Sequence, residues 1–223
     1  MPKDSIIILS GGLDSTTLLH QYASRIAVAV TFDYGSNHAA REIECARAQT
    51  AQLGIEHIVI PLGFMSRYFS SSLFEGADAV PDAEYSEDNM RSTVVPFRNG
   101  IMLAIAAGLA ESRGLEFVIM ANHGGDHDLY PDCRQEFVEA MSAATQAGTY
   151  ARVKVLAPYT GISKADIAAV GKRLGIDYTA TYSCYRGGEH HCGRCATCRE
   201  RHAALLAAGI PDLTIYDSDP EII

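Results

Sequence analysis

The chain has 223 residues, enough for one domain with a small appendage. Hydrophobic residues make up 48% of it, which allows a full core and excludes a largely disordered chain. The formal net charge of −9 disfavours steering to nucleic acid, and it favours a small anionic substrate carried with a metal ion.

The N-terminus lacks a secretory pattern, because the apolar run over residues 5–9 is short and Asp14 follows closely. No stretch reaches the roughly 18 apolar residues of a membrane span. We therefore expect a cytoplasmic protein without a membrane partner. Four of the six cysteines lie between positions 184 and 198, and in a reducing compartment such a cluster indicates metal binding rather than disulfides.

Short apolar runs alternate with segments of helical periodicity in the first part of the chain. This alternation predicts βαβ units in a parallel sheet covered on both faces. Gly54 marks one helix end, because glycine is common just past a helix terminus. In chain order we expect strand 5–10, helix 14–24, strand 25–32, helix 37–53 and strand 57–60.

Residues 61–96 show no clear periodicity and include the acidic stretch DAVPDAEYSED. A loop of this length without regular structure is uncommon in a compact domain unless it is functional or mobile. We interpret it as a lid.

The second part of the chain continues the same alternation. The helix over 98–113 is almost continuously apolar and should be central, and Ser163 with Asp166 fits a capping box. A short alanine-rich helix and an acidic tail are expected after the cysteines. In chain order we expect helix 98–113, strand 115–120, helix 133–147, strand 153–156 and helix 163–174.

These elements predict an α/β fold, with a Rossmann-like parallel sheet, helices on both faces and a small C-terminal zinc-binding segment. We place the boundary so that residues 1–182 form the nucleotide-binding domain and 183–223 the zinc-binding segment with its helix.

The first strand runs into the loop SGGLDSTT. Glycines allow backbone N–H groups to approach a ligand closely, and the following helix offers free N–H donors and a positive dipole end. Such a loop is an anion site suited to phosphate. The alternative is a plain turn in which Asp14 and Ser15 cap the helix. The loop matches neither the Walker A pattern nor GxGxxG.

The segment SCYRGGEHHCGRCATCRERH has the spacing C-x7-C-x2-C-x2-C. Four thiolates suit the tetrahedral preference of zinc, and a closed shell indicates a structural site. The alternatives are an iron–sulfur cluster, or a core helix that carries the cysteines. The predicted ligands are Cys184, Cys192, Cys195 and Cys198.

Several motifs resemble those of a known family. SGGLDS is similar to the SGGxDS signature of the PP-loop ATP pyrophosphatases. VVPFRNGIMLAIA, YPDCRQEF, TFDYG and the cysteine segment resemble the QueC family of 7-cyano-7-deazaguanine synthases, in the expected order from residue 10 to about residue 201. NHGGDHDLY departs from the TDFSGY found in some members, with Leu129 in place of a glycine.

The resemblance implies a PP-loop fold and a ligase. In this family 7-carboxy-7-deazaguanine is adenylated by ATP, ammonia displaces AMP to give an amide, and a second ATP activates the amide on the way to the nitrile. The implied cofactors are ATP, Mg²⁺ and structural Zn²⁺. Family precedent also implies a homodimer, with small-molecule substrates and no nucleic-acid partner.

The resemblance and the loop physics together assign the site residues. Catalytic roles fall to Asp14, Ser15, Arg98 and Lys164. The nucleotide is expected to contact Leu9, Ser10, Gly11, Gly12, Leu13, Asp14, Ser15, Thr16, Thr17, Leu18, Leu19, Asp33 and Tyr34. The deazaguanine is expected to contact Asp126, Asp132 and Arg134, since carboxylates accept paired N–H donors.

Two other functions fit some of these motifs. A tRNA-thiolating PP-loop enzyme would need a reactive cysteine, such as Cys133, and a basic surface, which the net charge disfavours. A non-catalytic nucleotide-binding zinc protein is the second alternative. His123 and His127 are expected at the loop or rim rather than in catalysis.

Overall fold

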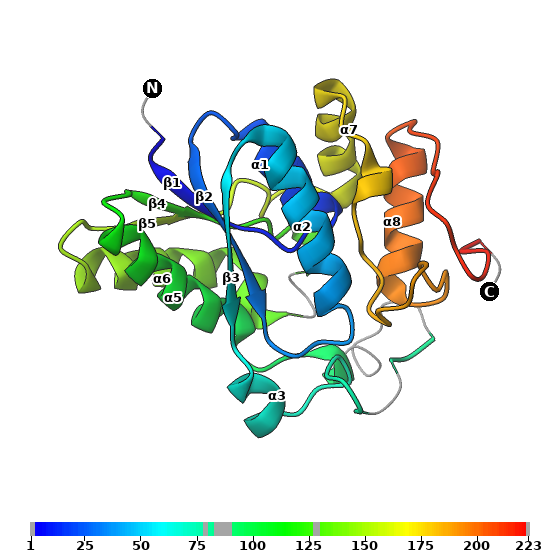
Figure 1. Cartoon of the computed structure of the whole chain (residues 1–223), viewed down its shortest axis with the longest axis horizontal. Helices are drawn as coiled ribbons and strands as arrows, with labels where there is room; N and C mark the ends of the chain where they lie inside the picture. Colours follow the sequence, from blue (N-terminus) through cyan, green and yellow to red (C-terminus); the bar gives the residue numbers. More distant parts are fainter. Residues whose placement is uncertain (1–2, 78–79, 83–90, 127–129, 222–223) are drawn as a thin grey trace.

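The computed structural model describes residues 3–77, 80–82, 91–126 and 130–221. Its centre is a five-stranded parallel sheet in the order β3-β2-β1-β4-β5 (Figure 1). Apolar β1 lies in the middle, where Ile7 pairs with Ala29 on one side and with Ile119 on the other. The strands are β1 (Ser5–Ile8), β2 (Ile26–Asp33), β3 (Glu56–Pro61), β4 (Phe117–Ile119) and β5 (Lys154–Leu156).

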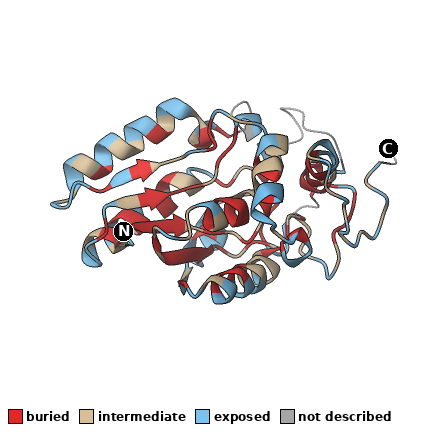
Figure 2. Ribbon diagram, turned by 90° about the horizontal axis from the view of Figure 1, so that it is seen from above, coloured by how far each residue is buried: buried red, intermediate tan, exposed pale blue. Residues whose placement is uncertain are grey.

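Helices cover both faces of the sheet, as the sequence predicts (Figure 1). Alternate side chains of β1 point to opposite faces, so Ile6 packs in the core beneath α5 and α6, and Ile7 packs in the core beneath α1, α2 and α7. The central strands β1 and β2 are mostly buried between these layers, whereas the edge strand β3 is only partly buried (Figure 2). The long helices are α1 (Leu13–Gln21), α2 (Ala39–Leu53), α5 (Arg98–Ser112), α6 (Gln135–Gly148), α7 (Lys164–Leu174) and α8 (Ala196–Ala207).

The prediction that α5 is a buried central helix is confirmed, since Leu103, Ala106 and Ala110 are fully buried. Within the described part of the chain, Arg91–Ser112 is the one helical stretch with the length and composition of a membrane span, and 44% of its most apolar window is buried inside the protein. The packing of α5 on the sheet accounts for this apolar composition.

Residues 61–96 are more regular than predicted. They contain a short helix, α3 (Phe64–Tyr68), and a 3₁₀ turn at Arg91–Thr93. Leu73, Phe74 and Val95 anchor the described parts of this segment in the main core. Residues 78–79 and 83–90 lie outside the described residues, and the lid stays a prediction.

The cysteine segment differs from the prediction at its end. Helix α8 begins directly after Cys195 and includes Cys198, whereas the sequence analysis placed a helix after the cysteines. The last glycine of the segment is Gly193, and the residues beyond it are good helix formers. The predicted capping box of α7 is confirmed, because Ser163 and Asp166 exchange hydrogen bonds.

Arg201 on α8 is the largest fully buried side chain, with 1% exposure. Its guanidinium donates to Thr181 Oγ1 at 2.8 Å, to the Tyr178 carbonyl at 2.6 Å and to Thr214 Oγ1 at 3.0 Å. It therefore ties α8 to the loop after α7 and to the C-terminal tail. Burial lowers the pKa of Arg201.

Replacing Arg201 with Met should destabilise the protein, because the charged hydrogen bonds that tie α8 to the loop after α7 and to the tail would be lost. A hydrogen bond to a charged group contributes about 1.5–3 kcal/mol, so we expect a loss of at least about 3 kcal/mol of unfolding free energy in urea titrations. Arg173→Met, on the exposed face of α7, is the matched control and should change stability by less than about 0.5 kcal/mol. Equal effects of the two variants would contradict this role.

Candidate functional site

A cavity of about 220 Å³ opens at the carboxyl ends of the strands. Its walls include residues that directly follow β1, β2 and β4, such as Ser10, Tyr34 and Asn122. The strand order reverses between β1 and β4, and the loops that leave these strands diverge to opposite faces. Such a switch point is where open α/β sheets bind their ligands.

The glycine loop forms one wall of this cavity. Gly11 has a φ of +80°, and a Cβ atom there would lie 2.5 Å from the carbonyl oxygen of Glu42. Only glycine therefore allows both this turn and the close packing of α2. Gly12 is the N-cap of α1 and has no side chain to cap it, while Ser10 and Ser15 share a hydrogen bond of 3.0 Å. The helix N-terminus thus faces the cavity with its N–H donors.

Asp14, His123, Lys164 and Glu200 form a charged group, here called the Asp14 cluster. The Lys164 Nζ atom lies 2.6 Å from Glu200 Oε2 and 3.3 Å from Asp14 Oδ2. The His123 Nε2 atom lies 3.7 Å from Glu200 Oε1 and 3.9 Å from Asp14 Oδ2. Four elements distant in sequence therefore meet beside the glycine loop.

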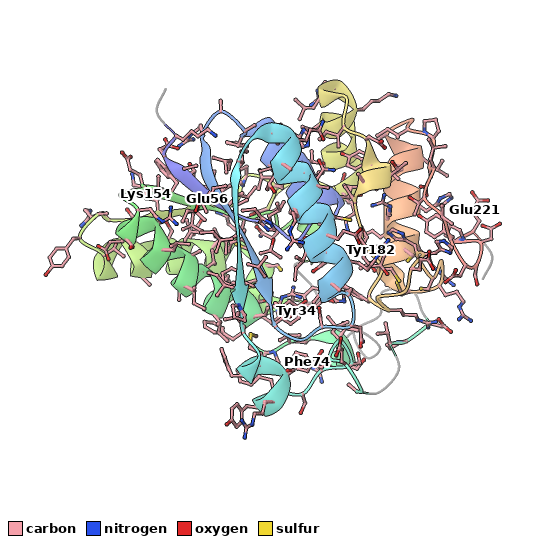
Figure 3. The ribbon with its side chains drawn as sticks, viewed as in Figure 1. Tyr34, Glu56, Phe74, Lys154, Tyr182 and Glu221 are labelled. Atoms are coloured by element: carbon pink, nitrogen blue, oxygen red, sulfur yellow. The ribbon has the colours of Figure 1, made fainter. Side chains whose placement is uncertain are left out.

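Tyr34, His38, Glu42 and Arg98 form a second group, here called the Glu42 cluster, and all four line the same cavity. Arg98 donates to the Tyr34 hydroxyl at 3.3 Å, and that hydroxyl lies 3.3 Å from His38 Nε2. Figure 3 places Tyr34 near the carboxyl end of β2. Burial and the charge of Arg98 lower the pKa of His38 to about 4, so this imidazole is neutral.

The residue before Arg98 has strained backbone. Phe97 has a φ of 53°, a left-handed conformation that is uncommon outside glycine. Its ring lies over Gly100, where a Cβ atom would approach Phe97 Cε1 to 2.3 Å, and meets Phe137 edge-on at 5.9 Å. Burial disfavours the Arg98 charge, but Tyr34, Tyr185 and Asp132 outweigh it and raise the pKa of the guanidinium.

The predicted nucleotide contacts divide into two groups. The cavity wall includes Leu9, Ser10, Gly12, Leu13, Asp14, Ser15, Tyr34, Arg98 and Lys164. Other predicted residues lie behind the wall. Leu18 and Leu19 are fully buried in the core, Thr17 bonds to the Tyr178 hydroxyl at 2.7 Å, and Thr16 is fully buried on α1. Asp33 accepts a hydrogen bond from the Gly35 backbone and does not line the cavity.

The residues predicted to bind the substrate lie apart from the cavity lining wherever their side chains are described. The carboxylate of Asp132 accepts a hydrogen bond of 2.9 Å from the backbone N–H of Asn99, in the first turn of α5, where a negative charge is stabilised. Arg134 is the N-cap of α6. Neither residue lines the cavity. The side chain of Asp126 lies outside the described residues, as does His127.

The four predicted cysteine ligands lie together. Their Sγ atoms are all buried and within 4.8 Å of one another, which fits a single tetrahedral ion. Backbone N–H groups point at the sulfurs, including those of Cys192 toward Cys184 at 3.4 Å and of Cys195 toward Cys192 at 3.3 Å. Gly193 has a φ of +73°, and a Cβ there would clash with the Ser218 carbonyl. Tyr182, between α2 and α8 in Figure 3, leads into this segment.

His123 lies in the loop after β4, as the sequence predicts, but its side chain is only 2% exposed and lines the cavity. Its place in the loop that leaves the carboxyl end of β4 was a usable signal, because ligands meet the strand ends in such sheets. His38, Glu42 and Glu200 were missed. Glu42 and Glu200 lie on helices and His38 caps the start of α2, and no local motif marks which face of a helix meets a distant loop.

Comparisons with known proteins identify a single family. A family model described as "Queuosine biosynthesis protein QueC" matches residues 4–209. A 7-cyano-7-deazaguanine synthase of Porphyromonas gingivalis (strain W83) is 56% identical over 215 residues, which cover 96% of this chain and 98% of that protein. A 7-cyano-7-deazaguanine synthase of Desulfotalea psychrophila is 48% identical with the same coverage.

Among solved structures, an NMN synthetase from Francisella tularensis has a similar fold, with a TM-score of 0.53 and 12% sequence identity. The match covers 93% of this chain and 78% of that one, and at this identity it supports the architecture alone. The family match, by contrast, extends from β1 through α8. This chain therefore belongs to the QueC family of queuosine biosynthesis proteins.

Proposed function

We propose that the protein converts 7-carboxy-7-deazaguanine and ammonia into 7-cyano-7-deazaguanine, with ATP cleaved to AMP and pyrophosphate, in queuosine biosynthesis. Family membership supports the substrate. The observation that carries the proposal is the glycine loop opening into one cavity with Asp14, Lys164 and Arg98.

The chemistry explains why such a loop is needed. A carboxylate does not expel oxide, so its oxygen must first attack the α-phosphate of ATP, with pyrophosphate as the leaving group. N–H groups at the start of α1 and the hydroxyls of Ser10 and Ser15 are suited to hold that pyrophosphate. We assign Lys164 and Arg98 to neutralise charge that develops on the phosphates. Ammonia then displaces AMP, and a second adenylation on the amide oxygen leads to the nitrile.

Asp14 is an unexpected charge in an anion site. Carboxylate and hydroxyl oxygens are the ligands that Mg²⁺ prefers, and Asp14 lies beside Ser15 at the loop. We propose that these two residues hold the Mg²⁺ ion that accompanies ATP, where it would offset charge on the phosphates. The Lys164 Nζ atom, 3.3 Å from Asp14 Oδ2, lies beside this proposed ion site.

The cysteine cluster is proposed to bind one structural zinc ion. We also propose that residues 183–223 form a segment appended to the ATP-binding domain of residues 1–182. Helix α8 carries both Cys198 and Glu200, and Glu200 contacts Lys164. A metal-ordered α8 would therefore position Lys164 at the glycine loop.

The assembly and location are further proposals. We propose a cytoplasmic homodimer, supported by family precedent and by the exposed apolar side chains of Leu206, Leu213 and Ile215 on α8 and the tail. Light scattering on a gel-filtration column measures the oligomeric state, and a mass of one chain would contradict the dimer.

The function is tested by product analysis with ATP, ammonium and 7-carboxy-7-deazaguanine. We expect 7-cyano-7-deazaguanine in the mass spectrum, with AMP and pyrophosphate formed in step. Absence of both nitrile and substrate-dependent pyrophosphate would overturn the proposal.

Replacing Asp14 with Ala should lower substrate-dependent pyrophosphate release by about 100-fold or more, because the site loses its proposed Mg²⁺ ligand. Bound zinc should be unchanged, since the cysteines lie in another segment. Glu139→Ala, on the exposed side of α6, should retain full activity. Turnover of Asp14→Ala within a few-fold of the unaltered protein would contradict the assigned role.

Elemental analysis should find about one zinc per chain. Cys192→Ser should lose the metal and expose α8 to rapid amide hydrogen exchange, because a structural zinc contributes folding free energy of about 10–16 kcal/mol in small sites. Cys45→Ser, outside the cluster and only partly buried, should keep the zinc. Iron with visible absorbance would instead indicate an iron–sulfur cluster.

A further inference from the structure

Glu42 is the acidic residue of the Glu42 cluster. It lies in the first turn of α2 and lines the cavity. Its carboxylate belongs to the cavity lining, and its backbone carbonyl packs against Gly11 of the glycine loop. Glu42 therefore lies next to the place where the loop would hold the phosphates of ATP. No role assigned above uses this carboxylate.

The surroundings leave the Glu42 carboxylate available for a ligand. The nearest ionisable partner among the described residues is His38, whose Nε2 atom lies 3.9 Å from Glu42 Oε2. Within the described residues, no group donates a hydrogen bond to this carboxylate. It is partly buried, with 18% of the side chain exposed toward the cavity. An acceptor in this position can take a proton from a bound molecule.

His38 does not neutralise Glu42. The Nδ1 atom of His38 faces the Tyr185 carbonyl at 3.4 Å and so carries the proton. Nε2 then accepts a hydrogen bond from Tyr34, whose hydroxyl in turn accepts one from Arg98. The imidazole is neutral, and Arg98 is the cation whose charge acts on Glu42.

The proposed reaction needs a base that removes protons from the attacking nitrogen. It needs no base at the substrate carboxylate. When ammonia attacks the acyl adenylate, a C–N bond forms, AMP leaves with the C–O electron pair, and nitrogen must lose one proton. On the way from amide to nitrile, AMP leaves again and nitrogen loses its two remaining protons, whose bonding electrons complete the C≡N bond. The first adenylation starts from an ionised carboxylate and requires no base.

We propose that Glu42 is the general base that takes these protons from nitrogen one at a time, in the amide-forming and nitrile-forming steps, and passes each to solvent before the next transfer. This inference rests on the proposed function and assigns a catalytic residue to it. The carboxylate lines the same cavity as the glycine loop, where the activated carbon would be bound.

The electrostatics of the site agree with this role. Burial raises the pKa of Glu42 to about 8, and Arg98 offsets only part of that effect. A base with a pKa near the working pH is the most effective in proton transfer. Because the pKa of Glu42 is higher in the folded protein than in the unfolded chain, this residue lowers the folding stability as the pH rises from about 4.5 to about 8. Glu42→Gln should therefore stay folded at pH 8.

The experiment separates the first adenylation from the nitrogen steps. Exchange of labelled pyrophosphate into ATP, dependent on 7-carboxy-7-deazaguanine, measures the first step, and amide plus nitrile measure the later ones. We expect Glu42→Gln to retain exchange within about threefold and to lose amide and nitrile formation by about 10²–10⁴-fold. Hydroxylamine, which loses its proton more readily than ammonia, should restore acyl transfer as the hydroxamate.

Each other outcome overturns the proposal. Nitrile formation by Glu42→Gln within tenfold of the unaltered protein would exclude a catalytic base at this position. Loss of exchange together with the nitrogen steps would assign Glu42 to ATP binding or to the placement of Arg98. Glu44→Gln is the matched control, because it is exposed two positions along the same helix and should leave every step unchanged.

A different result would overturn the proposed function itself. If the unaltered protein shows no exchange with 7-carboxy-7-deazaguanine, the substrate assignment is wrong, and the role of Glu42 falls with it. Exchange by the unaltered protein with full nitrile formation by Glu42→Gln would overturn only the general base.

Discussion

The parallel sheet constrains everything else in this molecule, because it delivers the carboxyl ends of β1, β2 and β4 to one edge. Each strand there ends in polar residues: Ser10 after β1, Tyr34 after β2, and Asn122 with His123 after β4. Backbone hydrogen bonds between the strands fix the spacing of these strand ends, and therefore the position of the cavity. The loops supply chemistry on a frame that the apolar runs determine.

Charge in the cavity is distributed between two clusters. In the Asp14 cluster, Lys164 lies between two carboxylates close to an anion site. In the Glu42 cluster, burial raises the pKa of the Glu42 carboxyl, and the charge of Arg98 offsets only part of that effect, while His38 is neutral. Asp14 is thus paired with a cation, whereas Glu42 is a buried carboxyl with a raised pKa, and the two groups are suited to different tasks. Groups with shifted pKa values are typical of catalytic sites.

Sequence reasoning predicted the sheet, its helices and the cysteine cluster, because these depend on local patterns. Apolar runs of strand length, a Gly54 helix stop and the Ser163 capping box each act within a few residues. The loop over 61–96 was harder, since Leu73 and Phe74 enter the core without any periodic signal. Glu200 shows why part of the site escaped prediction. Its contact with Lys164 joins two helices across 36 positions of sequence, and only the packing of α7 on α8 brings them together.

Asp132 shows how a motif residue can be tied into the fold. It lies within a family motif that predicts substrate recognition, and in the structure its carboxylate accepts a backbone hydrogen bond in the first turn of α5. The substrate role stays a prediction. Asp132 contributes to the site indirectly, because α5 begins with Arg98. A residue can thus belong to a functional motif by fixing the helix that carries the functional group.

The left-handed backbone at Phe97 has a consequence for how this site can change. The conformation costs about 1–2 kcal/mol for a non-glycine residue, and the ring contacts with Gly100 and Phe137 hold it in place. Arg98, whose side chain lines the cavity, thus follows a backbone position that is held by an aromatic contact outside the cavity. A side chain larger than glycine at position 100 would meet the Phe97 ring. The start of α5 therefore depends on residues that do not line the cavity.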